Sequence, residues 1–224
     1  MSFSKEIVQD STYLDKYAMY ECNPCLNPNE LNQYDNTLQK HSPDRFNEWF
    51  DPEKYDWKTG SAYLCRYLPH QFNKWFDPNR FDWENGSWAL CKYVSKQFDK
   101  WFDKEKFDWY SSSGALAKYV SDRFDIWWDA EKFRWVIGSD ALCEYAADKF
   151  DVWWNKDKFN YYYSSELCEY LTDKFDIWFD MNKFDWSHDS WALCEFLTDK
   201  AEIWFAPENF LFTEDENIEY LKLY

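Results

Sequence analysis

A tryptophan that recurs about every 26 residues is the feature that most limits what this chain can fold into. The seven tryptophans are Trp49, Trp75, Trp101, Trp127, Trp153, Trp178 and Trp204. An aromatic residue follows each of them directly, and a phenylalanine stands three positions before the first six. A unit of this length cannot bury so many rings by itself, so neighbouring units have to stack against one another. The repeat therefore predicts a solenoid.

The pattern within a unit favours helices. Apolar residues recur at intervals of three and four, which is the period of a helix face and not the alternation of a strand. We expect the serine before each Leu-Cys-x-Tyr-like segment to cap a helix, because its oxygen can accept from the free amides of the first turn. These serines are Ser61, Ser87, Ser139, Ser164 and Ser190. Glycine precedes three of them, at Gly60, Gly86 and Gly138, where we expect a left-handed backbone.

A second helix is expected to begin about eight residues after each serine. Pro69, Ser95 and their equivalents stand there, and such residues suit a helix start better than a helix interior. Asp51-Pro52 and its equivalents then predict one further helical turn. The fold class predicted is all-α, an α-solenoid of short helices with about six to seven repeats.

The repeats divide the chain into three parts. Residues 1–45 are expected to be a degenerate repeat that caps the N-terminal end, and residues 201–224 a partial repeat followed by a C-terminal capping helix. Six full repeats lie between them. Their predicted ranges are 46–71, 72–97, 98–123, 124–149, 150–174 and 175–200.

The seven cysteines are of two kinds. Five share one position of the repeat, which favours small buried side chains over metal ligands. They are Cys65, Cys91, Cys143, Cys168 and Cys194. Cys22 and Cys25 form a CxxC pair, and a metal or redox role for them stays open, although structural zinc needs two more ligands. The odd number of cysteines, with no basic start followed by an apolar stretch, predicts a reduced cytoplasmic protein.

Catalytic and cofactor motifs are not found. Acidic groups such as Asp51, Glu53 and Asp56 return in several units, as helix caps do, whereas a catalytic pair is normally singular. The chain has only 4 glycines, and they form no phosphate-binding loop. We therefore expect a protein that is not an enzyme and needs no cofactor. A carboxylate-based hydrolase is the distant alternative.

The repeated sequence resembles that of a group of known proteins. Leu-Cys-x-Tyr and Asp-Lys-Phe-Asp-x-Trp-Phe-Asp-x-x-Lys-Phe-Asp-Trp are similar to segments of uncharacterised aromatic repeat proteins of large bacteriophages and viruses. The resemblance covers about residues 46–212 and carries over no functional residues. It implies a mobile-element origin, a location in the host cytoplasm and a role in host interaction or anti-defence.

Charge is distributed unevenly along the chain. Residues 46–123 hold twelve basic and twelve acidic side chains, whereas residues 124–224 hold nine basic and twenty-three acidic ones, a net charge of −14 out of −17. The residue before the repeated tryptophan changes at the same boundary, from charged to aliphatic. It is Glu48, Lys74 and Lys100, and then Ile126, Val152, Ile177 and Ile203. Either the second half buries this position, or it exposes an aliphatic strip suited to protein docking.

These features predict a scaffold whose acidic C-terminal half docks on a basic partner protein. One version is nucleic-acid mimicry, in which the carboxylates imitate phosphates and block a nucleic-acid-handling enzyme of the host. The predicted acidic contacts are Asp125, Glu144, Asp151, Glu169, Asp176, Glu195 and Glu202, beside the four aliphatic residues named above. Direct nucleic-acid binding and membrane insertion are not expected, because acids repel phosphates and no long apolar run occurs. The alternative is a structural protein that self-associates through the solenoid, as a homo-oligomer.

Overall fold

The structure is a computed structural model that describes residues 46–205 of the chain. Contacts group the chain into two units, Met1–Tyr55 and Asp56–Tyr224. The described part of the first unit is helix α3 (Phe46–Trp49) and the turn that follows it. The predicted N-terminal cap, the CxxC pair and the predicted C-terminal capping helix lie outside the described residues.

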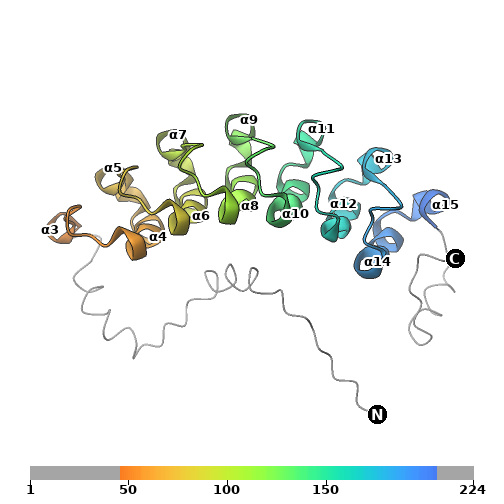
Figure 1. Cartoon of the computed structure of the whole chain (residues 1–224), viewed down its shortest axis with the longest axis horizontal. Coiled ribbons are helices and arrows are strands. Elements are labelled where there is room, and N and C mark those ends of the chain that lie inside the picture. Colours follow the sequence, from red (N-terminus) through yellow and green to blue (C-terminus); the bar gives the residue numbers. More distant parts are fainter. Residues whose placement is uncertain (1–45, 206–224) are drawn as a thin grey trace, which may run out of the picture. The chain divides into compact units, whose positions relative to one another are not determined.

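Residues 56–205 repeat one pattern, a long α-helix, a single 3₁₀ turn, a short α-helix and a hydrogen-bonded turn. The long helices are α4 (Trp57–Tyr67), α6 (Trp83–Val94), α8 (Trp109–Val120), α10 (Trp135–Tyr145), α12 (Ser164–Tyr170) and α14 (Trp186–Phe196). The short helices are α5 (Phe72–Trp75), α7 (Phe98–Trp101), α9 (Phe124–Trp127), α11 (Phe150–Trp153), α13 (Phe175–Trp178) and α15 (Ala201–Trp204). Long helices form one row and short helices a second row (Figure 1). Consecutive long helices contact one another, which confirms the expected all-α solenoid.

The 3₁₀ turns connect each long helix to the short helix after it. They are η2 (Pro69–Gln71), η3 (Ser95–Gln97), η4 (Ser121–Arg123), η5 (Ala147–Lys149), η7 (Thr172–Lys174) and η8 (Thr198–Lys200). Their first residues are those at which the sequence predicts a helix start. The repeat of residues 150–174 has 25 residues instead of 26. It is shorter at the start of its long helix, where the 3₁₀ turn η6 (Tyr161–Tyr163) replaces the first α-helical turn.

Aspartates, and not the expected serines, cap the long helices. Asp56 accepts from the amides of Lys58 and Thr59, and Asp82, Asp108 and Asp185 cap α6, α8 and α14 in the same way. The helix cap therefore lies five residues earlier than predicted, and Ser61 lies inside the helix. The prediction was wrong because an inner serine near a helix start has the same sequence pattern as a capping one.

The buried serines instead tie each repeat to the next. Ser113 donates to the Trp109 carbonyl at 2.5 Å and accepts from the Arg134 amide, at the start of the next long helix, at 2.9 Å. The other serine oxygens accept in the same way over 2.9–3.2 Å. They belong to Ser61, Ser87, Ser139 and Ser164. Each serine hydroxyl thus accepts a hydrogen bond from the backbone amide at the start of the next helical segment.

The repeated tryptophan closes the other end of the long helix. Trp127 is fully buried, and its indole Nε1 donates to the Val120 carbonyl, at the end of α8, over 2.9 Å. The same bond recurs at 2.7–2.9 Å in the other described repeats. At Leu68, Ala146, Leu171 and Leu197 the same carbonyl also accepts from an amide of the 3₁₀ turn, so the indole is a second donor that ties the short helix to the end of the long one.

The core is a ladder of aromatic rings. Phe124 and Trp127 lie edge to face at 4.8 Å, and Phe124 stacks on Trp128 at 5.1 Å, as the spacing of three and four residues predicts. The repeated cysteines are buried except for Cys194, which is partly exposed, and this confirms their expected place in the core.

The glycines do not adopt the expected left-handed backbone. All three lie within helices, and no residue in the described range has a positive φ. Gly138 is required by packing instead, because an added Cβ would lie 2.6 Å from Cζ of Phe133. Gly86 meets Phe81 in the same way.

Candidate protein-docking surface

The four aliphatic residues before the repeated tryptophans lie on the surface. We call Ile126, Val152, Ile177 and Ile203 the aliphatic column; these side chains are 48%, 60%, 56% and 48% exposed. In each short helix the residues at the first and fourth positions turn inward, so the two between them point outward. The interpretation that this position is buried in the second half is therefore wrong. The column places apolar side chains in water once per repeat.

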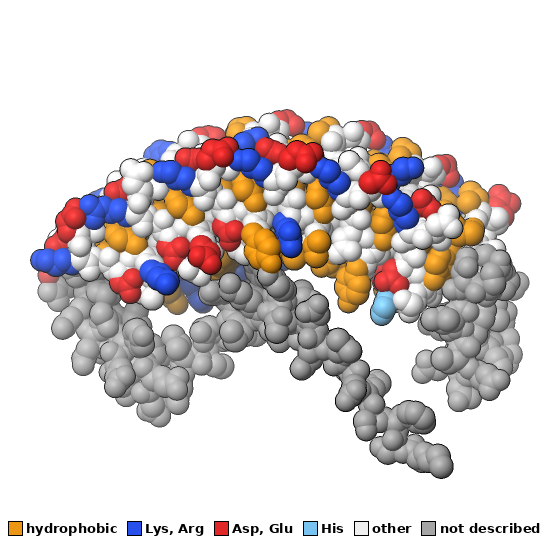
Figure 2. Space-filling view, in the orientation of Figure 1, with side chains coloured by type: hydrophobic (Ala, Val, Ile, Leu, Met, Phe, Trp, Pro, Cys, Tyr) orange, Lys and Arg blue, Asp and Glu red, His pale blue; other side chains and the backbone are white. Residues whose placement is uncertain are grey.

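The predicted acidic residues fall into two groups. Asp125, Asp151, Asp176 and Glu202 stand next to the aliphatic column on the short helices, and all four are exposed. Glu144, Glu169 and Glu195 are also exposed but lie on the long helices, in the other row. In Figure 2, clusters of apolar, acidic and basic side chains recur side by side over the face in view.

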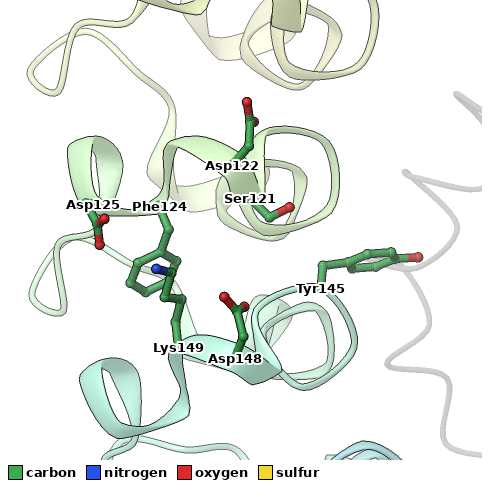
Figure 3. A pocket seen from close by; sticks show the side chains of 7 residues that line it. All are labelled: Ser121, Asp122, Phe124, Asp125, Tyr145, Asp148 and Lys149. Atoms are coloured by element: carbon green, nitrogen blue, oxygen red, sulfur yellow. The ribbon is translucent and has the colours of Figure 1, made fainter.

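Consecutive repeats leave hollows on the surface, and these lie between the acids of the short helices and the glutamates of the long helices. One hollow of about 290 Å³ is lined by Asp125 of α9, Tyr145 of α10 and Asp148 of η5. In Figure 3, Lys149 extends alongside Phe124, with acidic side chains around it, while Tyr145 points away. An equivalent hollow of about 370 Å³ is lined by Asp176 and Asp199 two repeats later. Each hollow is therefore an acidic concavity that connects a short helix to the long helix after it.

The structure adds acids that the sequence reasoning missed. The middle residue of each 3₁₀ turn is His70 or Lys96 in the first half and an exposed aspartate afterwards. These aspartates are Asp122, Asp148, Asp173 and Asp199. The signal was present in the sequence, because this position changes at Asp122, four residues before the aliphatic column begins at Ile126. The significance of this change became clear only from the structure, in which these aspartates line the hollows.

Some surface acids are paired with basic residues. Lys174 lies 3.3 Å from Asp151, and Lys158 donates to Glu131 at 2.6 Å, each connecting one repeat to the previous one. Such exposed pairs contribute little to the free energy of unfolding, about 0–1 kcal/mol. They do lower the local negative charge where they occur.

A tyrosine column runs along the ends of the long helices. It consists of Tyr67, Tyr93, Tyr119, Tyr145 and Tyr170, and Phe196 takes the next position. In the first half the residue before each ring is basic, and Lys118 lies 5.7 Å from the centroids of both Tyr119 and Tyr145. In the second half this residue is glutamate. Burial, and then the hydrogen bond with Glu144, raise the pKa of Tyr145.

A group of carboxylates lies between the long helices of the second half. Burial raises the pKa of Asp140, and the carboxylate of Glu166 in the next repeat raises it further. Oδ1 of Asp140 is buried and has no hydrogen-bond partner among the described residues. Asp189 is also buried and accepts from the Ser165 amide at 2.9 Å; burial raises its pKa as well.

The recurrent acids of the turns serve the backbone. Asp103 accepts from the amides of Glu105 and Lys106, which is the capping role that the recurrence predicts. Burial raises the pKa of the repeated cysteine thiols, so they are poor nucleophiles. Within residues 46–205, His, Cys, Asp and Glu form no group of three that could hold a metal ion.

Comparisons with protein-family models, with curated proteins and with solved structures give no match. Over the same described range, no helix has the length and apolar character needed to cross a bilayer.

Proposed function

We propose that this chain is a non-enzymatic scaffold whose second half docks on a basic surface of a partner protein. The contact region consists of the aliphatic column, the acids beside it and the glutamates of the long helices. Apolar side chains would be covered on docking, and the surrounding carboxylates would pair with basic side chains and speed association.

One observation supports this proposal above the others: several surface positions change between residues 96–118 and the equivalent stretch 26 residues later, 122–144. Lys100 becomes exposed Ile126, Lys118 becomes Glu144, and Lys96 becomes Asp122, while the buried positions keep their residue types. Core packing does not require these changes, because the same fold continues on both sides of the boundary. An interface on one half accounts for all of them.

The partner class that best fits this surface is a protein that handles nucleic acid. Exposed carboxylates recur once per repeat in several columns, and a regular array of negative charges is what a phosphate-binding groove recognises. The resemblance to phage and viral repeat proteins adds an anti-defence role to this proposal, in which the scaffold occludes a host enzyme.

The test is affinity capture from the native cell, or from the host of a virus, with the full chain as bait. We expect a nucleic-acid-handling protein to be captured and to be released by added duplex DNA. The variant Glu144→Lys/Glu169→Lys/Glu195→Lys should lose this protein while its helical content, measured by circular dichroism, stays the same.

A matched control separates docking from bulk charge. Glu48→Lys/Glu53→Lys/Glu84→Lys changes the net charge equally, but its three sites are exposed positions before the fourth repeat. This control should still capture the partner. Equal capture by both triple variants and the unmodified chain would contradict docking through the acidic half.

A further inference from the structure

The first half of the tyrosine column shows what fills the space between consecutive rings. Lys92 lies 5.6 Å from the centroid of Tyr93 and 5.7 Å from that of Tyr119, one repeat later. Lys118 lies in the same way between Tyr119 and Tyr145. Each ammonium is therefore placed between two aromatic faces, an arrangement that cation–π attraction favours.

The ring positions continue into the second half, where none of residues 46–205 places a cation over Tyr170 or Phe196. We call the space between Tyr145 and Tyr170 the first slot and that between Tyr170 and Phe196 the second slot. The residues equivalent to the two lysines are Glu144 in the first slot and Glu169 in the second. Glu144 influences both neighbouring rings, since after burial its charge is among the causes that raise the pKa of Tyr145 and of Tyr170.

A carboxylate there changes what the slot attracts. The face of an aromatic ring is electronegative, so it attracts a cation and gains nothing from a second negative charge. Each slot thus lies between two successive ring positions of the column and has a carboxylate where the first half has an ammonium, and Tyr170, shared by both slots, remains 37% exposed. A lysine or arginine from another molecule would meet the surroundings that Lys118 has within the chain, with an ion pair in addition.

We infer that the two slots bind lysine or arginine side chains of a partner polypeptide, one cation between each pair of rings. This inference rests on the proposed function and specifies how the basic partner is recognised. Packed helices lie about 8–10 Å apart, and an extended chain advances about 3.3 Å per residue. A segment that reaches consecutive slots therefore carries a basic residue at about every third position.

The experiment uses the full chain and a synthetic peptide with four Lys-Ser-Ser repeats. An isomer with a contiguous lysine pair at each end, and therefore no two lysines three positions apart, serves as the second probe, and isothermal titration calorimetry at low salt gives both dissociation constants. The spaced peptide should bind more tightly than this isomer. Equal affinities, or no binding of the spaced peptide, would overturn the inference.

Variants of the shared ring test the slots without changing the net charge. Tyr170→Leu should weaken binding of the spaced peptide about three- to tenfold, and Tyr170→Phe should retain binding, because the ring face and not the hydroxyl holds the cation. Tyr67→Leu is the matched control, since Tyr67 belongs to the same column and already has Arg66 at 5.2 Å. Its dissociation constant should equal that of the unmodified chain.

A second variant fills the slots from within the chain. Glu144→Lys/Glu169→Lys recreates the first-half arrangement and should abolish peptide binding while leaving the fold intact. Binding by Tyr170→Leu equal to that of the unmodified chain would refute the slots. If the glutamate triple variant still lost its captured protein in that case, docking through the acidic half would stand without them.

Discussion

At the scale of single residues, the repeated tryptophan contributes both packing and a hydrogen bond. The indole of Trp127 fills the core and donates to the carbonyl that ends α8. A phenylalanine at this position would keep most of the apolar contact but remove the hydrogen bond from the indole to the buried Val120 residue. Because tryptophan combines a large ring with this N–H donor, no other aromatic residue stands at this position.

Trp127→Phe should therefore lower the free energy of unfolding by about 2–4 kcal/mol, from the lost ring volume and the lost indole hydrogen bond. Urea denaturation followed by circular dichroism measures the change. Trp191→Phe makes the same substitution at a residue that is 52% exposed, and it should cost less than about 1 kcal/mol. Similar losses in the two variants would show that the buried hydrogen bond contributes little.

Asp140 is a residue whose ionisation opposes folding. Its pKa is raised in the folded state, so folding becomes less favourable as pH rises from the unfolded-state pKa, near 3.8, through the folded-state value. Asp140→Asn should be more stable than the unmodified chain at neutral pH, by about 1 kcal/mol, and equally stable below both pKa values. Urea midpoints measured across this pH range check the prediction.

Asp157 provides the opposite case as a control. The hydrogen bond from Lys183 lowers the pKa of Asp157, so its ionised form stabilises the fold at neutral pH and this contribution disappears as pH falls. Asp157→Asn should thus be the less stable protein at neutral pH. A stability difference of the same sign for both variants would be inconsistent with these opposite shifts.

At the scale of elements, glycines in the long helices make room for the groups that pack against them. Gly138 of α10 lies under the Phe133 ring, where a Cβ does not fit, whereas at Gly114 of α8 an added Cβ would lie 3.3 Å from the Ile137 carbonyl oxygen. The second contact is tight but needs only a small adjustment. Packing against Phe133 therefore requires glycine at position 138, whereas position 114 has nearly enough space for a Cβ.

This difference predicts that replacing glycine by alanine has different effects on stability at the two positions. Gly138→Ala should lower the free energy of unfolding by about 1–3 kcal/mol through overpacking, despite the better helix propensity of alanine. Gly114→Ala should be close to neutral, because a propensity gain of about 1 kcal/mol offsets the slight crowding. Thermal unfolding of both variants tests this, and a stabilised Gly138→Ala protein would disprove the steric role of Phe133.

At the scale of the whole molecule, one scaffold carries two surfaces of different charge. The core of residues 56–205 continues through the boundary near residue 124, while the surface changes from balanced to acidic. Like charges on the second half repel one another, and salt screens this repulsion as it screens attraction to a basic partner. Salt should therefore act in opposite directions on stability and on docking.

Raising sodium chloride from about 0.05 M to about 0.5 M should slow hydrogen exchange in α12 and α14 more than in α6, because screening relieves repulsion in the second half. Over the same range the affinity for the basic peptide should fall. Hydrogen exchange with mass spectrometry and calorimetry measure the two effects. Equal salt responses of the two halves would contradict the charge division.

By itself the sequence determined the repeat length, the helical class and the burial of phenylalanine, tryptophan and cysteine, because rings at intervals of three and four need a helix face and a stacked neighbour. Only the tertiary structure decided what surrounds each remaining position. Ser61 ties two repeats and does not cap a helix, Gly138 yields space to a ring, and Ile126 points outward. The role of Ser61 depends on contact with the next repeat, and the other two outcomes depend on how the turn and the short helix fold back on the core, which a local pattern does not contain.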